Sequence, residues 1–143
     1  MDTASIIDVL NRLLQILCRS LPRYLEDAYP WAGHNDEPIE AMLAGVAADQ
    51  SAMADTIART VIEQGGRPEP GRFPSEFTAI NDLAIRFLLE RLIEHQQRDV
   101  AAMEECVAAL APMPVMRALA EEALRGAKEH LDIMNEVRAN RYA

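Results

Sequence analysis

Apolar residues recur every three or four positions along most of this chain, and prolines or glycines interrupt the pattern. Such spacing puts the apolar side chains on one face of an α-helix. In the first segment Ile6, Leu10, Leu13 and Leu17 follow it. The strict alternation of apolar and polar residues that is typical of β-strands does not occur. We therefore predict an all-α protein.

The interruptions divide the sequence into four helical segments. Pro22 lies inside the first of them and predicts a kink or a break there. Asp36 is expected to cap the start of the second helix, Gly65 its end, and Ser75 the start of the third. The short last connection makes the third and fourth helices antiparallel neighbours. We predict one domain, residues 1–143, that forms an antiparallel four-helix bundle with helices at about 4–29, 37–64, 76–111 and 115–140.

The length and composition suit a single bundle and exclude some classes of partner. A chain of 143 residues can bury a substantial core. With 5% aromatic residues, that core must consist of aliphatic side chains and methionine. The formal net charge of −9 argues against a nucleic-acid-binding surface, which needs clustered Lys and Arg. The same charge disfavours docking on anionic membranes, so we expect neither nucleic acid nor a membrane as a partner.

The two cysteines, Cys18 and Cys106, lie in apolar helical surroundings and form no Cys-x-x-Cys pair. Free cysteines behave as small buried hydrophobic residues, so we expect two reduced thiols. Asp8, Asn11 and Arg12 interrupt the apolar residues near the N-terminus, so we expect no signal peptide. No apolar run is long enough to span a bilayer. These features predict a cytoplasmic protein.

Several stretches resemble the ferritin-like superfamily, in particular bacterioferritin and rubrerythrin. The segment Ile6-Ile7-Asp8-Val9-Leu10-Asn11-Arg12-Leu13-Leu14 looks like the opening of the first bacterioferritin helix. Gly65-Gly66-Arg67-Pro68 is similar to the turn that ends the second helix of that family, and Lys128-Glu129-His130-Leu131-Asp132 resembles its fourth helix. The resemblance spans nearly the whole chain and implies a ferritin-like bundle.

The resemblance also implies where a di-iron centre would lie. In that family, Glu on the first and third helices and Glu-x-x-His on the second and fourth point inward and hold two ions. Carried over to this chain, the positions are Leu17, Gln50, Met53, Glu94, Ala127 and His130, with Glu90 in place of Glu94 if the alignment shifts by one turn. Only Glu94 and His130 keep a ligating side chain. The resemblance therefore implies that this chain has lost the di-iron centre.

Glu94 and His130 leave two interpretations open. They could hold a single iron, zinc or manganese ion, with help from Gln50, Glu90 or Cys18. Alternatively, they form a hydrogen-bonded pair across the bundle, since a buried polar group needs a partner. Acid–base catalysis by this pair lacks a neighbouring nucleophile.

We expect a structural or protein-interaction module without a cofactor or catalytic residues, and a homodimer formed through the first and second helices. The apolar residues beyond the core stripe suggest this dimer: Val9, Leu14, Ile16, Ala44, Ala47, Ala48, Ala54 and Ala58. The alternative is a metal-binding protein for iron storage, oxidation or sensing that uses the reduced site. A third possibility is a small apolar ligand in the former metal cavity, because Leu17, Met53 and Ala127 make that region apolar.

Overall fold

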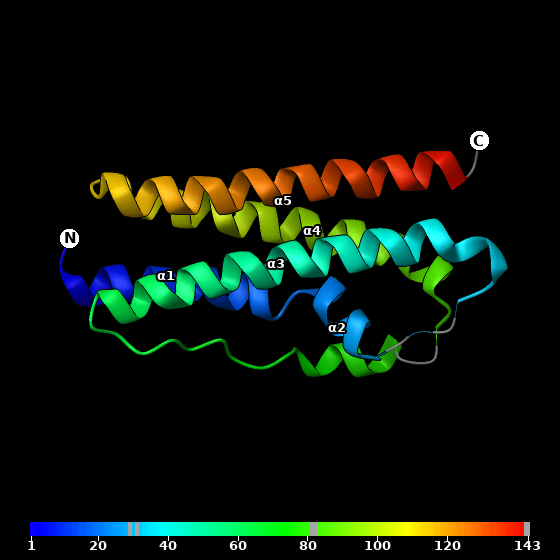
Figure 1. Cartoon of the computed structure of the whole chain (residues 1–143), viewed down its shortest axis with the longest axis horizontal. Coiled ribbons are helices and arrows are strands. Elements are labelled where there is room, and N and C mark those ends of the chain that lie inside the picture. Colours follow the sequence, from blue (N-terminus) through cyan, green and yellow to red (C-terminus); the bar gives the residue numbers. More distant parts are fainter. Residues whose placement is uncertain (29, 31, 81–82, 142–143) are drawn as a thin grey trace.

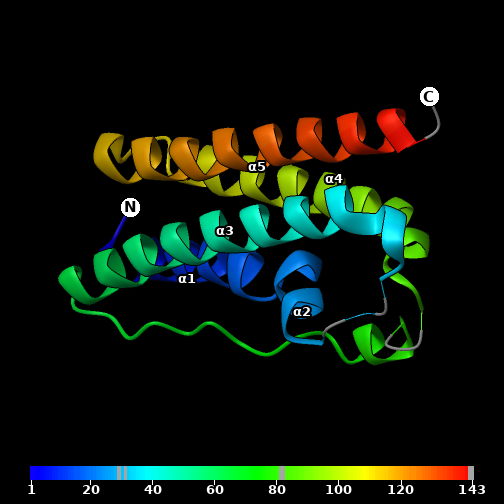
Figure 2. The same cartoon turned by 45° about the vertical axis from the view of Figure 1, so that its right-hand side comes forward.

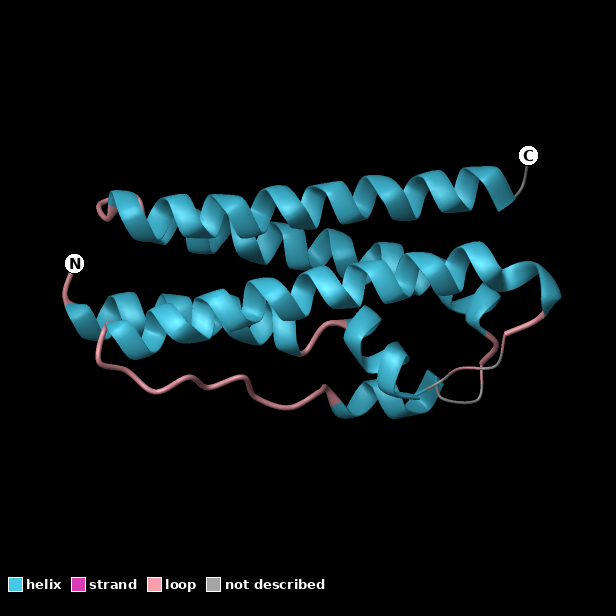
Figure 3. Ribbon diagram, viewed as in Figure 1, coloured by secondary structure: helices cyan, strands magenta, loops and turns pink. Residues whose placement is uncertain are grey.

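The computed structural model describes the chain except residues 29, 31, 81, 82, 142 and 143 (Figure 1). Its regular structure, within that range, consists of helices joined by loops (Figure 3). The α-helices are α1 (Thr3–Cys18), α2 (Leu21–Ala28), α3 (Glu37–Glu63), α4 (Ile85–Ala109) and α5 (Pro114–Arg141), and two short 3-10 helices are η1 (His34–Asp36) and η2 (Ser75–Ile80). The all-α prediction is confirmed. No helix in the described part of the chain is both long and apolar enough to cross a membrane.

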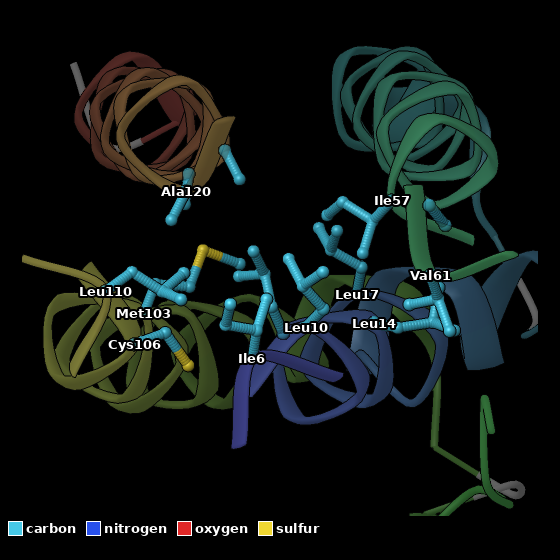
Figure 4. Packing of buried hydrophobic residues seen from close by; sticks show 14 of the residues in the cluster. Ile6, Leu10, Leu14, Leu17, Ile57, Val61, Met103, Cys106, Leu110 and Ala120 are labelled. Atoms are coloured by element: carbon cyan, nitrogen blue, oxygen red, sulfur yellow. The ribbon is translucent and has the colours of Figure 1, made fainter. Parts of the chain in front are cut away.

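The four long helices lie side by side around a common interior: α1 and α5 each contact both α3 and α4, and α3 also contacts α4 (Figures 1 and 4). The neighbouring helices α4 and α5 run in opposite directions, as the short connection between them predicts. The helices α3 and α4 run in the same direction, because residues 64–80 return along the length of the molecule between them (Figures 1 and 2). We call residues 64–80 the crossover segment.

The first predicted helix is divided in two, as Pro22 indicates. The α-helix α1 ends at Cys18, and Pro22 lies in the first turn of α2, where a missing N–H is tolerated. Ser20 caps this second helix, since its Oγ accepts a hydrogen bond from the Arg23 N–H at 3.3 Å. The predicted end of the segment, residue 29, lies outside the described residues.

The second predicted helix agrees with α3 to within one residue, but the role of Asp36 was wrong. At the C-terminal end, Gly65 has φ +84°, and the Gly66 N–H donates to the Val61 carbonyl at 2.9 Å. This is the glycine C-cap that the sequence predicts. Asp36 occupies the N-cap position without capping the helix. Its buried carboxylate instead accepts from the Gly33 N–H at 2.7 Å and from Arg141 Nη1 at 3.1 Å.

The third predicted helix begins nine residues too early, because Ser75 starts η2 and α4 begins only at Ile85. Phe77 and Ile80 of η2 are both buried. The Phe77 ring stacks on Tyr24 of α2, with ring centroids 5.3 Å apart. The chain therefore turns in this region to bury two large side chains against α2 and α4 instead of extending α4.

The hydrophobic core consists of two clusters stacked along the helices. One cluster joins α1 with the C-terminal halves of α3 and α4 and the N-terminal half of α5; Figure 4 shows its side chains meeting between the four ribbons. The other joins α2 and η2 with the N-terminal halves of α3 and α4 and the C-terminal half of α5. Leu14, Ala47 and Ala54, which were expected on a dimer surface, are buried.

Side chains of α1 fasten the crossover segment to the helices. Buried Asn11 donates from Nδ2 to the Arg67 carbonyl at 3.1 Å, and its Oδ1 accepts from the Glu69 N–H at 2.9 Å. Gln15, one turn further, donates from Nε2 to the Glu69 carbonyl at 3.1 Å. These bonds satisfy backbone groups of a segment that has no ladder of its own.

We expect Asn11→Ala to lower the free energy of unfolding by about 2 kcal/mol, because two hydrogen bonds are lost and the facing backbone groups are left unpaired. Gln15→Ala is the matched control. It removes one exposed bond and should lower the free energy of unfolding by less than about 1 kcal/mol. Urea unfolding followed by circular dichroism measures both, and equal losses would contradict the fastening role of Asn11.

Candidate functional site

A layer of buried polar side chains separates the two hydrophobic clusters. Ser20 Oγ donates to Gln50 Oε1 at 2.7 Å, which joins the α1–α2 junction to α3. Gln96 Nε2 of α4 donates to the carbonyl of Ala127 on α5 at 2.9 Å. His130 Nε2 of α5 lies 2.9 Å from an Asp49 carboxylate oxygen on α3. We call Ser20, Gln50, Gln96 and His130 the polar layer.

A pocket of about 250 Å³ lies beside the polar layer, bounded by α1, α3, α4 and α5. Its walls combine aliphatic side chains and thioethers with a few polar groups. Its apolar lining is Leu17, Met53, Met103, Ala123 and Ala127. Its polar lining includes Asp49, Gln50 and His130 together with exposed Glu122, Arg125 and Glu129.

The imidazole of His130 is a buried titratable group in the pocket lining, and it pairs with a carboxylate. Its side chain is 9% exposed, whereas that of Asp49 is 71% exposed, so the carboxylate extends from solvent onto a buried ring. An ionised carboxylate only accepts hydrogen bonds, so Nε2 must carry the proton that is shared with Asp49. A metal ion could therefore reach Nε2 only by displacing Asp49.

Five of the six positions that the family resemblance assigns to metal ligands line this pocket: Leu17, Gln50, Met53, Ala127 and His130. Glu94 does not. Its side chain is exposed and lines a different hollow, with Phe77, His95 and Arg98. The inward-facing residue of α4 is Gln96, and a difference of two residues turns a side chain by about 200° around a helix.

The other suggested metal ligands are engaged elsewhere. Exposed Glu90 pairs with Arg138 at 3.0 Å. Cys18 is partly buried against the first hydrophobic cluster, and Cys106 is buried; both thiols are free. Among the described residues, no group of three or more His, Cys, Asp or Glu side chains is placed to share one ion. A metal at His130 would thus need ligands other than Glu94.

Sequence reasoning missed Asp49, Met103 and Gln96. A signal for Gln96 was present, since it continues the spacing of buried Leu89 and Ile93 and precedes buried Val100 and Met103. Asp49 carried no signal of its own, because it lies on the exposed side of α3 and reaches His130 only through its side chain.

Comparison of the chain with protein-family models, curated proteins and solved structures found no match.

The pocket lining includes apolar, amide, imidazole and charged side chains. None of its described lining residues carries a hydroxyl or thiol nucleophile beside His130. The buried atom Gln96 Oε1 has no hydrogen-bond partner in the described part of the chain, so the polar layer is not fully satisfied. Apolar walls with a few fixed polar groups are typical of small-molecule sites.

We expect Ser20→Ala to lower the free energy of unfolding by about 2 kcal/mol, since it removes the α2 cap and leaves buried Gln50 Oε1 without its donor. The double variant Ser20→Ala/Gln50→Met should recover part of this loss, because no unpaired amide remains. A thermodynamic cycle from urea unfolding measures the coupling energy. Additive effects would show that the two side chains are energetically independent.

Proposed function

We propose that this protein is a ferritin-like four-helix bundle that has lost its di-iron centre and acts as a non-catalytic binding module. The observation that carries the proposal is that five of the six positions expected for ligands line one pocket. Leu17, Gln50, Met53 and Ala127 supply neither carboxylate nor imidazole there. The carboxylates that do line the pocket, Asp49, Glu122 and Glu129, are exposed and are not placed to share one ion, so two divalent cations inside would have too little negative charge around them.

The path of the chain supports the ferritin-like part of the proposal. Ferritin-like bundles contain one long crossover connection, whereas simple up-down bundles have only short loops. The crossover segment lets α3 and α4 run in the same direction (Figure 1). Free Cys18 and Cys106 fit a reducing compartment, so the cytoplasm is the proposed location.

The pocket favours a small, uncharged and largely apolar ligand that carries one polar group. Leu17, Met53 and Met103 provide aliphatic and thioether contacts, which adapt to flat or irregular shapes. Gln50 and His130 can orient one donor or acceptor of the ligand. The volume of about 250 Å³ suits a molecule of one or two rings.

A single metal ion is the second candidate, and the pairing of His130 with Asp49 favours it. A carboxylate that accepts the second ring N–H is the arrangement that orients histidine ligands in metal sites. In this case the ion would bind through Nδ1, because Nε2 donates to Asp49.

We propose a homodimer formed mainly through the outer face of α3. Ala41, Ala44, Ala48 and Ala52 are exposed on this face at helical spacing. Side chains this small allow two helix axes to approach closely. On the outer face of α1, exposed Asp8 and Arg12 are charged. The dimer proposed here therefore relies on the second of the two helices that the sequence suggested.

Indole, which has a flat apolar ring and one N–H donor, is a suitable probe of the pocket. We expect saturable binding by isothermal titration calorimetry and no detectable binding to Ala127→Leu, which fills the pocket. Ala118→Leu is the control, since Ala118 is exposed on the same helix. Iron(II), zinc and manganese(II) should leave the melting temperature unchanged. A metal-dependent rise that His130→Ala abolishes would favour the metal-binding alternative instead.

Sedimentation velocity at micromolar concentration tests the dimer. Ala48→Arg places a charged side chain in the proposed α3 contact and should convert the dimer to a monomer. Ala101→Arg, at an exposed position of α4, should leave the dimer intact. A wild-type protein that sediments as a monomer would rule the dimer out.

A further inference from the structure

A second pocket, of about 390 Å³, lies under the crossover segment, between the C-terminal end of α1, η2 and α4. Three arginines line it: Arg12, Arg19 and Arg98. This concentration of positive charge occurs in a chain with a net charge of −9. Ile16, Leu21 and Phe77 supply an apolar wall. The pocket shares no lining residue with the one beside His130.

Arg19 packs against the crossover segment, and its Nε lacks an acceptor. Gly71 has φ +76°, and a Cβ at that position would lie 3.0 Å from Arg19 Cδ, so the crossover backbone passes directly over the side chain. Arg19 Nε is buried and has no hydrogen-bond partner among the residues that the structure describes. A desolvated guanidinium N–H without an acceptor is unfavourable, and an anionic oxygen would relieve it. Arg12, by contrast, pairs with Glu105.

Asp99 and His95 line the same pocket, one turn apart on α4. Burial raises the pKa of Asp99 to about 7, although the charge of Arg98 opposes this shift. His95 packs edge-on against the Phe77 ring, with centroids 5.3 Å apart. Burial and the nearby charge of Arg98 lower the pKa of His95, so the imidazole is mainly neutral at neutral pH.

We propose that this pocket binds a small organic monocarboxylate, whose carboxylate contacts the Arg19 guanidinium and whose apolar part packs against Ile16, Leu21 and Phe77. The planar guanidinium fork matches the two oxygens of a carboxylate. Asp99 and Glu76 also line the pocket and would repel a dianion such as phosphate. The apolar wall distinguishes an organic acid from an inorganic ion.

Binding is stronger at about pH 6.5 than at about pH 8. Protonated Asp99 no longer repels the ligand and can donate a hydrogen bond to it. The other charged and titratable groups that line this pocket are Arg12 and Arg19 of α1, Glu76 of η2, and His95 and Arg98 of α4. The pKa of Asp99, about 7, lies within this pH range, whereas burial and the charge of Arg98 lower the pKa of His95 to below it. We therefore assign the pH dependence to Asp99.

Benzoate, titrated into the full chain by isothermal titration calorimetry, is the test. We expect saturable binding that weakens about tenfold or more in Arg19→Gln and in Arg19→Lys, which keeps the charge but loses the fork. Arg59→Gln is the control, because it makes the same charge change on the exposed side of α3. Asp99→Asn should bind equally at both pH values. Melting curves confirm that each variant is folded.

Three results would overturn the proposal. One is the absence of saturable benzoate binding up to about 10 mM, because a dissociation constant above that value is too weak for a dedicated site. Another is equal affinity of folded Arg19→Lys and wild type. The third is that phosphate or uncharged benzamide binds as tightly as benzoate. Tight phosphate binding would mean a general anion site, and tight benzamide binding would mean a purely apolar site.

Discussion

The polar layer fixes the register of the long helices against one another. Hydrophobic faces of helices tolerate sliding, since one aliphatic side chain replaces another with little change in energy. Buried hydrogen bonds do not, because a shift of one residue leaves donors and acceptors unpaired. The Ser20–Gln50 bond links the α1–α2 junction to α3, the Gln96–Ala127 bond links α4 to α5, and the His130–Asp49 contact links α5 to α3. These three interactions therefore align α1, α3, α4 and α5 along their lengths.

The crossover segment is the second element on which the structure depends, and side chains rather than backbone ladders hold it. Asn11 fixes its first part to α1. A row of rings fixes the rest, in which Tyr24 contacts both Phe73 and Phe77, and Phe77 contacts His95. Among the described residues, these three ring contacts lie together where the crossover segment meets α2 and α4. The arginine-lined pocket lies beneath this part of the crossover segment, in the space that the ring contacts leave between α1, η2 and α4.

Much of the architecture follows from the sequence, because helical periodicity and Pro or Gly breaks are local signals. The bounds of α3 and α5, the break near Pro22 and the Gly65 cap were all predictable. The start of α4 was not, since burial of Phe77 overrides the propensity of a Ser-capped helical segment. Glu94 was misplaced because an alignment of amphipathic helices leaves the facing residue uncertain by about two positions, which reverses the side of the helix. The contact of Asp49 with His130 depends on how α3 and α5 meet, which no local pattern encodes.

Dividing the hydrophobic interior into two stacked compartments has a mechanical consequence. Dense packing resists deformation within each compartment, whereas the pocket leaves open space beside Gln50 and His130 between the compartments. Bending motions of α3 and α5 should therefore concentrate near the middle of these helices, where Gln50, His130 and the pocket interrupt the hydrophobic packing. Each compartment can stay intact while the angle between them changes. We therefore expect the middle of the molecule to deform more easily than its two hydrophobic ends, and the pocket beside His130 lies in this middle region.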